Sequence, residues 1–546
     1  MKDKGKTGSW LKPIQEVAAR AGIPEDSLIP MGRFMAKVDP SLIEKPSGRP
    51  DGKLVLVTAM SPTPAGVGKT TLSIGLTQSL NLLGKKAFAC IRQPSLGPLL
   101  GVKGGAMGSG ASEAGPLEDF SLQFNGDDYG VVTSHNLISA IIDNHIHHGN
   151  RLGIEKVIWP RVSTINDRAL RNILTGAGKG TTPRKDEFHI SAASEIMSML
   201  CLSHGLEDFR ERLRRTVVAF GKEGRPVTVS DLGIDGAAGA LMKNALMPNL
   251  AQSIEGAPVF IHGGPFGNIS IGCSSVSATK LALKLSDFVL TEAGFSTELG
   301  AEKFLDILCR QAGFYPSAAV IVATLNALRL HGGASDWSAP DMDSVKRGMA
   351  NLEKHIENLK AFRLPAVVVL NRFKGDTDKE IEETLKLIRG LGAPAAPVEV
   401  RDSGGQGGIE AAGAIIEACE NAGPQEFLYP LDMPIEEKID TIAVKMYGAK
   451  GISFSADAQK DLEDIKRLGL ARLPVCVAKT PKSLSDNPAL IGRPTGFTVT
   501  VTGLKPATGA GYIVAYCGNV LLMPGMPEHP LAEKMDIDAF GRVRGI

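Results

Sequence analysis

Short apolar runs recur along the chain, and amphipathic or glycine-bounded stretches separate them. The runs have the length of buried strands, and the stretches between them space their apolar residues as helices do. This alternation predicts an α/β protein in which a parallel sheet has helices on both faces. The expected strands are residues 54–57, 87–91, 157–159, 259–261, 288–290, 318–323, 366–370 and 473–478.

The first expected strand leads into a glycine-rich turn with the sequence GVGKTT at residues 66–71, and an apolar helical pattern follows as far as Gly84. Backbone N–H groups of such a turn bind phosphate oxygens, and the start of the helix adds partial positive charge. Lys69 would neutralise the terminal phosphates, and the Thr70 hydroxyl would ligate Mg²⁺. The pattern therefore indicates a P-loop NTPase-like nucleotide site more strongly than a structural turn.

The full Walker pattern has a glycine five residues before Gly68, and this chain has Thr63 there, so a strict pattern search misses the segment. The strand and helix on either side nevertheless supply the expected context. The predicted nucleotide-binding residues are Thr63, Pro64, Ala65, Gly66, Val67, Gly68, Lys69, Thr70 and Thr71.

Domain boundaries follow from the same patterning. Residues 1–365 are expected to form a P-loop nucleotide-binding α/β domain, with a helical lead-in over residues 1–50. Turn signals and β-like segments increase afterwards, and residues 366–546 are expected to form one or two smaller α/β domains. Residues 94–128 are rich in glycine and show no period, which predicts a long functional loop.

Polar residues follow several of the expected strands. Arg92 follows residues 87–91, and its guanidinium suits a two-pronged contact with a carboxylate or phosphate, although it could instead pair with an acidic neighbour. Three other expected strands are followed by polar segments, at residues 262–268, 291–295 and 371–373. Because ligands bind at the carboxyl ends of parallel strands, these endings predict one composite crevice for a large ligand.

Two further polar clusters have competing interpretations. His145, His147 and His148 could bind zinc, but no matching set of further ligands is visible, so polar packing near the crevice is the favoured interpretation. The cluster at residues 166–168, Asn-Asp-Arg, either shapes the same region or provides a helix N-cap.

Composition narrows the choice of partners. The formal net charge is +1 and aromatic residues make up 5% of the chain, which argues against nucleic acid or an anionic membrane as a partner. We find no apolar run of about 20 residues and no apolar core of a signal peptide. Seven cysteines are scattered without a close pair, which favours buried thiols in a reducing cytoplasm.

Long segments of the chain resemble formate–tetrahydrofolate ligases, also called formyltetrahydrofolate synthetases. The resembling segments are PTPAGVGKTT, RQPSLGPLLGVKGGA, IDNHIHHGN, NDRALRN, FIHGGPFGNI, LTEAGFSTELGAEKF, VIVATLNALRLHGG, NLEKHIENLKAF, LPVCVAKTPKSLSD and GRPTGFTVTV. The resemblance implies ATP-dependent ligation of formate to tetrahydrofolate through formyl phosphate, giving 10-formyltetrahydrofolate, ADP and phosphate. It also implies Mg²⁺, activation by a monovalent cation (K⁺ or NH₄⁺), and a homo-oligomer, commonly a tetramer.

The resemblance assigns roles to individual residues. Lys69 and Mg²⁺ would withdraw charge from the γ-phosphate, and Arg92 would hold formate and then formyl phosphate. Phe295 corresponds to the family's nucleotide-side loop, and Phe373 to an aromatic residue that packs on the pterin. Arg401 stands where the family has a pterin-stacking tryptophan, and it would provide less apolar contact.

Several positions depart from the family pattern, and most of them fall in the folate half. The departures are Val67 and Gln93 (each in place of a carboxylate), the segment 106–116, Ser270-Ile271, Ser274 and Arg401. Two alternatives therefore stay open: an ATP-binding regulatory protein that no longer ligates formate, and a ligase for another acid or amine. A partitioning-type ATPase shares the GKTT turn but does not account for the rest of the chain.

Overall fold

The computed structural model describes residues 10–45, 48, 50–102, 107–424, 426–518 and 520–545. Its largest feature is a 12-stranded mixed sheet in the order β1-β2-β14-β15-β4-β16-β3-β17-β18-β19, where β6 also pairs with β14 and β5 with β6. Neighbouring strands from β15 to β19 in this order are parallel. The predicted α/β class is confirmed, and an antiparallel edge of β14, β2 and β1 adds to it.

The elements have the following bounds. The strands of the main sheet are β1 (Leu28–Pro30), β2 (Ala36–Val38), β3 (Lys53–Ala59), β4 (Ala87–Ile91), β5 (Gly108–Ser109), β6 (Ser112–Gly115), β14 (Asn249–Ser253), β15 (Pro258–Ile261), β16 (Phe288–Glu292), β17 (Ala318–Ala323), β18 (Ala366–Asn371) and β19 (Ala395–Val398). The strands of the smaller sheets are β7 (Ile154–Val157), β8 (Arg161–Ser163), β9 (Ile173–Thr175), β10 (Arg184–Asp186), β11 (Phe188–Ile190), β12 (Val217–Gly221), β13 (Pro226–Thr228), β20 (Gly451–Phe454), β21 (Val475–Ala478), β22 (Thr498–Val501), β23 (Gly503–Ala507), β24 (Tyr512–Tyr516), β25 (Asp536–Ile537) and β26 (Val543–Arg544). The α-helices are α1 (Ile14–Ala21), α2 (Lys69–Leu82), α3 (Leu96–Gly101), α4 (Leu117–Ser121), α5 (Asp127–His147), α6 (Glu195–Leu202), α7 (Leu206–Arg215), α8 (Asp235–Met242), α9 (Val276–Leu285), α10 (Arg310–Ala312), α11 (Leu325–His331), α12 (Met342–Lys360), α13 (Asp378–Gly390), α14 (Val400–Ser403), α15 (Ile409–Glu420), α16 (Ile435–Ile442) and α17 (Ala456–Arg467).

Helices cover both faces of the parallel strands. On one face α2 and α15 pack against each other, α2 on β4 and β16, and α15 on β18 and β19. On the other face α9 packs on β4 and β16, and α12 on β17 and β18. The strands between these layers read as continuous apolar runs because neither face meets water. All residues of β4, β16 and β17 are accordingly buried.

Most of the expected strands are confirmed to within two residues at each end, as β3, β4, β15, β16, β17, β18 and β21. The prediction of a parallel-sheet strand at residues 157–159 is wrong in both the position and the pairing of the strand. The strand there is β7, which ends at Val157 and pairs antiparallel with β12 in a small sheet. Trp159 is buried instead by stacking on His135, with ring centroids 4.3 Å apart, so its apolar character reflects core packing.

Two other expectations change at the edge of the sheet. The lead-in contains α1 but also β1 and β2, which extend the sheet beside β14. The described residues of 94–128 form α3, the hairpin of β5 and β6, and α4 rather than one loop. A strand as short as β5 leaves no periodic signal in a sequence, which is why the pattern missed it.

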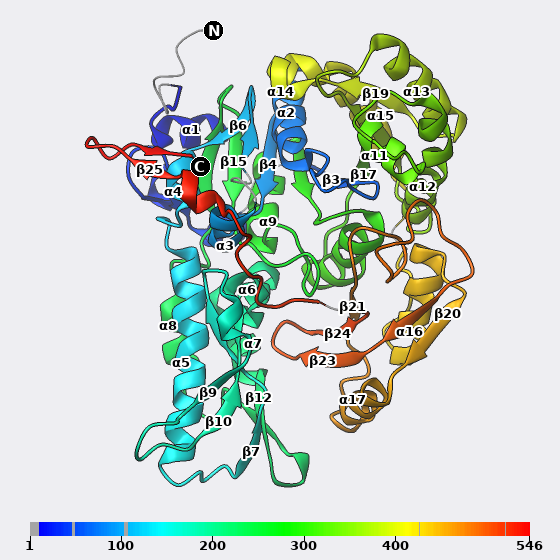
Figure 1. Ribbon diagram of the computed structural model, residues 1–546. Helices are drawn as coiled ribbons and strands as arrows, with labels where there is room; N and C mark the ends of the chain where they lie inside the picture. Colours follow the sequence, from blue (N-terminus) through cyan, green and yellow to red (C-terminus); the bar gives the residue numbers. More distant parts are fainter. Residues whose placement is uncertain are drawn as a thin grey trace.

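The rest of the chain forms two further parts beside the sheet (Figure 1). Helices α5 to α8 and the sheet of β7, β12 and β13 form a lobe that extends away from it. Helices α16 and α17 and the sheets containing β20 to β24 lie alongside, and the C-terminal segment returns so that its last helical turn packs on α3. The boundary at residue 365 stays a prediction, and β18 and β19, which follow it, continue the main sheet.

Candidate active site

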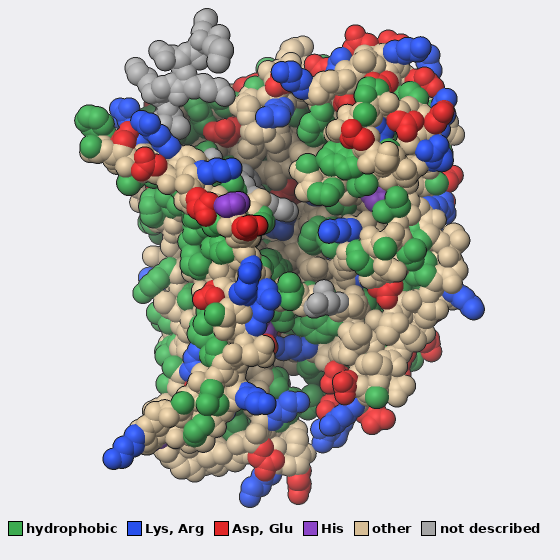
Figure 2. Space-filling model, viewed as in Figure 1, with side chains coloured by type: hydrophobic (Ala, Val, Ile, Leu, Met, Phe, Trp, Pro, Cys, Tyr) green, Lys and Arg blue, Asp and Glu red, His purple; other side chains and the backbone are tan. Residues whose placement is uncertain are grey.

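The site lies where the chain reverses its direction across the sheet. From β3 the chain continues to β4 on one side and later to β17 on the other, and such a switch point opens a crevice at the carboxyl ends of the strands. Figure 2 shows a hollow running down this face between the two halves of the molecule. The loops after β3, β4, β15, β16, β18 and β19 all follow parallel strands, so they lie at this one edge.

The loop between β3 and α2 has the conformation that its glycines predict. Gly66 and Gly68 adopt φ angles of +82° and +79°, which favour glycine. The Gly66 N–H donates to the Thr63 carbonyl at 2.9 Å, and the Thr63 hydroxyl donates to the Gly66 carbonyl at 3.2 Å. Thr63 is therefore buried in the turn, while Pro64 and Ala65 are exposed at its tip.

Helix α2 begins at Lys69, and no described side chain caps its N-terminus at Gly68. The first backbone N–H groups of a helix need acceptors, and they attract anions. Lys69, Thr70 and Thr71 lie in this first turn and are half-buried. The arrangement matches a phosphate-binding loop.

Asn371 at the end of β18 holds this loop in place. Its side-chain amide donates to the Val67 carbonyl at 3.0 Å. A Cβ atom at Gly68 would lie 2.9 Å from the same amide nitrogen, so glycine is required there for packing as well as for its φ angle. Val67 itself is 2% exposed, so its side chain supplies apolar packing to the loop and no charge.

Glu292, the last residue of β16, joins the loop to the neighbouring strand end. Its side chain accepts a hydrogen bond from the Thr70 hydroxyl at 2.8 Å and lies 3.6 Å from Nε of Arg92. The Glu292 side chain is 2% exposed and that of Arg92 28%. Thr70, Arg92 and Glu292 therefore form one cluster at the ends of three adjacent strands, β3, β16 and β4.

Sequence reasoning predicted Thr70 and Arg92 but assigned no role to Glu292. A carboxylate at a strand end was visible in the sequence, but the order β4-β16-β3 that places it between the other two was not. The Arg92 Nε is buried and has no hydrogen-bond partner within the described part of the chain. This Nε faces Glu292, and because the Arg92 side chain is partly exposed, its outer N–H groups can donate to an anionic ligand.

Gln93 lies beside this cluster and contributes no charge to it. Its amide exchanges two hydrogen bonds with the amide of Asn125, each of 2.8 Å, and its backbone N–H donates to the Gly263 carbonyl at 2.8 Å. The side chain is 6% exposed. This neutral amide pair leaves Glu292 as the carboxylate nearest to Arg92 among the described residues.

Phe295 faces the glycine-rich segment after β15. Its backbone has a φ angle of +60°, unusual for an aromatic residue, and a Cβ atom at Gly267 would lie 3.0 Å from its ring. Lys303 is fully buried and donates to the carbonyls of Gly267 and Asn268, at 2.9 Å in the first case. The ring and the glycine-rich segment therefore pack against each other at this edge of the sheet.

Phe373 and Arg401 follow the adjacent parallel strands β18 and β19. Phe373 is half-buried, and its backbone N–H donates to Asp376 at 2.8 Å. Arg401 is exposed, and its carbonyl accepts a hydrogen bond from the Ala111 N–H at 2.7 Å. The structure brings the two residues to the same edge but does not stack Arg401 on the Phe373 ring.

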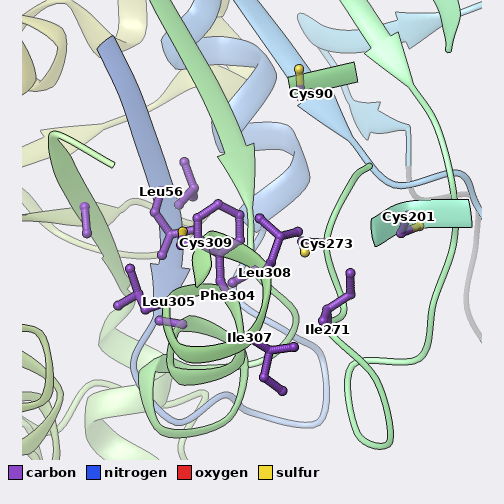
Figure 3. Packing of buried hydrophobic residues seen from close by; sticks show 14 of the residues in the cluster. Leu56, Cys90, Cys201, Ile271, Cys273, Phe304, Leu305, Ile307, Leu308 and Cys309 are labelled. Atoms are coloured by element: carbon purple, nitrogen blue, oxygen red, sulfur yellow. The ribbon is translucent and has the colours of Figure 1, made fainter. Parts of the chain in front are cut away.

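The departures at residues 270, 271 and 274 have structural roles. Ser270 and Ser198 share a hydrogen bond of 2.8 Å, and the Ser274 hydroxyl donates to the His262 carbonyl at 3.3 Å. Ile271 is fully buried and lies near Cys273 in the apolar cluster of Figure 3. Residue 106 of the departing segment 106–116 lies outside the described residues, and residues 107–116 contain the β5–β6 hairpin.

The expectation that the histidine cluster packs near the crevice is wrong. His145, His147 and His148 lie at the far end of α5, in the lobe, where His145 Nε2 accepts a hydrogen bond from the Leu152 N–H at 3.0 Å. No group of three or more His, Cys, Asp or Glu side chains among the described residues is arranged to hold a metal ion. Asp167 is an N-cap, accepting a hydrogen bond from the Ala169 N–H at 2.9 Å.

The histidine of the glycine-rich segment, His262, is fully buried and hydrogen-bonded at both ring nitrogens. Its Nδ1 lies 2.6 Å from the Ser275 hydroxyl and its Nε2 lies 2.7 Å from the Ala245 carbonyl. Burial lowers the pKa of His262. All seven cysteines are buried and unpaired, as expected. None of the described helices is long and apolar enough to cross a membrane.

Known proteins are similar to this chain over almost its whole length. A family model described as formate--tetrahydrofolate ligase matches residues 6–546. A formate--tetrahydrofolate ligase of Bacillus licheniformis is 48% identical over 543 residues, covering 98% of this chain and 97% of its own. One of Thermotoga petrophila is 48% identical over 542 residues, covering 98% of this chain and 100% of its own.

Among solved structures, the translation elongation factor SelB of Methanococcus maripaludis, in complex with the GTP analogue GppNHp, gives a TM-score of 0.18 at 18% identity. The match covers 30% of this chain and 31% of that one. A match this short and this weak supports no conclusion about the fold or the function of the present chain.

Proposed function

The chain belongs to the formate–tetrahydrofolate ligase family, and from this premise we propose that it ligates formate to tetrahydrofolate and converts ATP to ADP and phosphate. The observation that carries the proposal is the buried carboxylate of Glu292, which contacts both the first turn of α2 and Arg92. This contact supports the proposal, because a loop that would bind phosphate and an arginine that would bind an anion then lie in one site, as a reaction between ATP and a small carboxylate requires.

ATP would bind with its phosphates at residues 63–71, where backbone N–H groups and Lys69 neutralise their charge. The Thr70 hydroxyl and the Glu292 carboxylate fit Mg²⁺, which takes oxygen ligands. When bound, Mg²⁺ would supply positive charge to the phosphate oxygens. Phe295 would face the nucleotide side of the crevice.

Arg92 would hold formate beside the γ-phosphate. One formate oxygen forms a bond to the γ-phosphorus, the bond to the β–γ bridging oxygen breaks, and ADP leaves. The N10 amine of tetrahydrofolate then attacks the formyl carbon, phosphate leaves with the electrons of the C–O bond, and the amine loses its proton. Positioning and charge neutralisation by Arg92 and Lys69 would supply most of the catalysis.

The folate would bind near Phe373 and Arg401, whose strand ends are adjacent. Arg401 is exposed and its side chain can reorient over a flat ring. The family also supports a homotetramer activated by K⁺ or NH₄⁺, and the buried, unpaired cysteines support a reducing compartment such as the cytoplasm.

The decisive experiment measures formate-dependent ADP release with and without tetrahydrofolate, in wild type and in Lys69→Ala. We expect sustained turnover only with all three substrates, and a loss of turnover in the variant with its fold retained. Undiminished turnover in Lys69→Ala would contradict the assignment of the loop.

A second candidate function is ligation of another acid or amine. It is favoured by Gln93, which departs from the family pattern beside the proposed formate site, and by Arg401, which departs from it at the proposed folate site. ATP turnover that responds to a different carboxylate and not to formate would identify it.

A further inference from the structure

A pocket of about 480 Å³ lies where parts of the chain remote in sequence meet. Its walls come from the end of α7, from α10, from the turn between β23 and β24, and from the segment between α17 and β21. None of the lining residues belongs to the candidate active site. The pocket is therefore a separate feature of the fold.

The pocket carries an excess of positive charge. Arg215, Arg310 and Arg472 line it, and its described lining residues include no Asp or Glu. Arg310 is paired, since it donates to Asp306 at 2.9 Å. Arg215 donates only to neutral carbonyl oxygens, those of Thr508 and Gly509, each at 3.1 Å.

Arg472 differs from the other two arginines in being exposed and in making no hydrogen bond or ion pair with any residue that the structure describes. The Nε of Arg310 is buried, unlike Arg472, and it also has no hydrogen-bond partner in the described chain. The guanidinium of Arg472 can therefore bind a ligand in this pocket in place of water.

A lysine behind the wall responds to the same charge. Lys438 is fully buried and donates to the carbonyls of Leu431, Ala471 and Leu473 at 2.7, 2.8 and 3.1 Å. Leu431 and Leu473 themselves line the pocket. Burial, and then the nearby guanidinium groups of Arg310 and Arg472, lower the pKa of Lys438 to about 8, while the carboxylate of Asp432 acts in the opposite direction. Basic side chains therefore gather around this pocket, although Asp306 pairs with Arg310 and Asp432 lies near Lys438.

The remaining wall is largely apolar. Its side chains are Val217, Leu431, Leu470, Leu473 and Pro474. Pockets for small molecules combine such an apolar surface with a few polar groups that fix orientation, and their volumes are of this order.

We propose that this pocket binds a small organic anion that carries a phosphate or carboxylate group on an apolar body. The oxyanion would be held by Arg215 and Arg472, because guanidinium groups bind such anions through paired N–H donors. The apolar body would lie against the leucines. An inorganic anion would contact only the arginines, and a neutral apolar molecule would contact only the leucines.

The test titrates 1-naphthyl phosphate into the full-length protein by calorimetry, with saturating ADP and Mg²⁺ to occupy the phosphate-binding loop. We expect saturable binding to wild type and affinity at least about tenfold lower in Arg472→Gln, the equivalent of one charge-assisted hydrogen bond. Arg214→Gln, one residue from Arg215 but outside the pocket lining, is the matched control and should bind as wild type does. Arg215→Gln provides a second variant in the pocket lining.

Three results would overturn the proposal. Wild type that fails to bind would exclude the site, and equal affinity in wild type and both arginine variants would place the ligand elsewhere. Inorganic phosphate or 1-naphthol binding as tightly as 1-naphthyl phosphate would show that the pocket does not require both parts of the ligand.

Discussion

At the scale of single residues, Glu292 determines the charge balance of the candidate site. Its side chain is 2% exposed, and a buried carboxylate is stable as an anion only when it is paired and hydrogen-bonded. Thr70 and Arg92 provide those contacts. The two predicted functional residues are thus held together by a third.

Glu292→Gln tests this arrangement. The amide retains an acceptor for the Thr70 hydroxyl but lacks the negative charge that would support Mg²⁺ and orient Arg92. We expect formate-dependent ADP release to fall at least about 100-fold, a typical loss for one preorganised electrostatic group. The Mg²⁺ concentration for half-maximal rate should also rise. An unchanged Mg²⁺ dependence would remove Glu292 from the metal site.

Arg92→Lys separates geometry from charge. An ammonium keeps the positive charge but cannot make the two-pronged contact with formate. Turnover should therefore fall nearly as far in Arg92→Lys as in Arg92→Ala, by about 100-fold or more. ATP affinity, measured by calorimetry, should change little in both. A variant that loses ATP affinity and keeps its response to formate would contradict the assignment.

Arg401→Trp introduces an aromatic surface at the proposed folate position. The Arg401 side chain is exposed, so an indole can be placed there without disturbing the core. Tetrahydrofolate affinity should rise about tenfold, corresponding to roughly 1.4 kcal/mol, because stacking on an indole adds apolar contact. ATP affinity should not change. If wild type binds tetrahydrofolate tightly and the tryptophan weakens it, Arg401 is adapted to its ligand.

At the scale of elements, the loop between β3 and α2 depends on a strand that comes much later in the chain. The amide of Asn371, at the end of β18, bonds to the Val67 carbonyl. The first turn of α2 is thus oriented by β18 as well as by β3.

Asn371→Ala should loosen the loop without unfolding the sheet. We expect ATP affinity to fall about three- to tenfold, since one net hydrogen bond is worth about 1 kcal/mol. Asn81→Ala is the matched control: Asn81 bonds to the Thr77 carbonyl at 2.8 Å near the opposite end of α2. That variant should lower the melting temperature and leave ATP affinity unchanged. Equal losses of ATP affinity in both variants would argue against specific positioning of the loop.

At the scale of the whole molecule, a half-buried carboxylate joins the lobe to the C-terminal sheet. Glu195, at the start of α6, accepts hydrogen bonds from the backbone N–H groups of Gly509 and Ala510 at 2.7 and 3.2 Å. Burial raises the pKa of Glu195 from 4.5 to about 7. The folded protein therefore keeps a proton that the unfolded chain loses between these two pH values.

The melting temperature should consequently depend on pH through this residue. Because the unfolded chain releases its proton first, stability falls as the pH rises from 4.5 to about 7, by about 1–3 kcal/mol from this group. Glu195→Gln keeps the acceptor oxygen and removes the titration. Its melting temperature relative to wild type should be higher at pH 8 than at pH 5. A difference between the two proteins that does not vary with pH would show that Glu195 does not titrate in this window.

The sequence by itself determined the features that depend on neighbouring residues. The strand, loop and helix at residues 53–82 could be predicted because phosphate binding there requires only contiguous backbone and its glycines. The buried strands could be predicted because coverage on both faces demands apolar side chains at every position. The roles proposed for Arg92, Phe295 and Phe373 came from the resemblance to the ligase family.

Only the tertiary structure decided which of these features meet. The order β4-β16-β3 places Glu292 between Arg92 and Thr70, and the pairing of β18 with β19 brings Phe373 and Arg401 to the same edge of the sheet. Strand order depends on packing between helices and strands far apart in the chain, so no local pattern encodes it. The arginine pocket has the same origin, because its walls approach one another only when the lobe and the C-terminal sheet are in place.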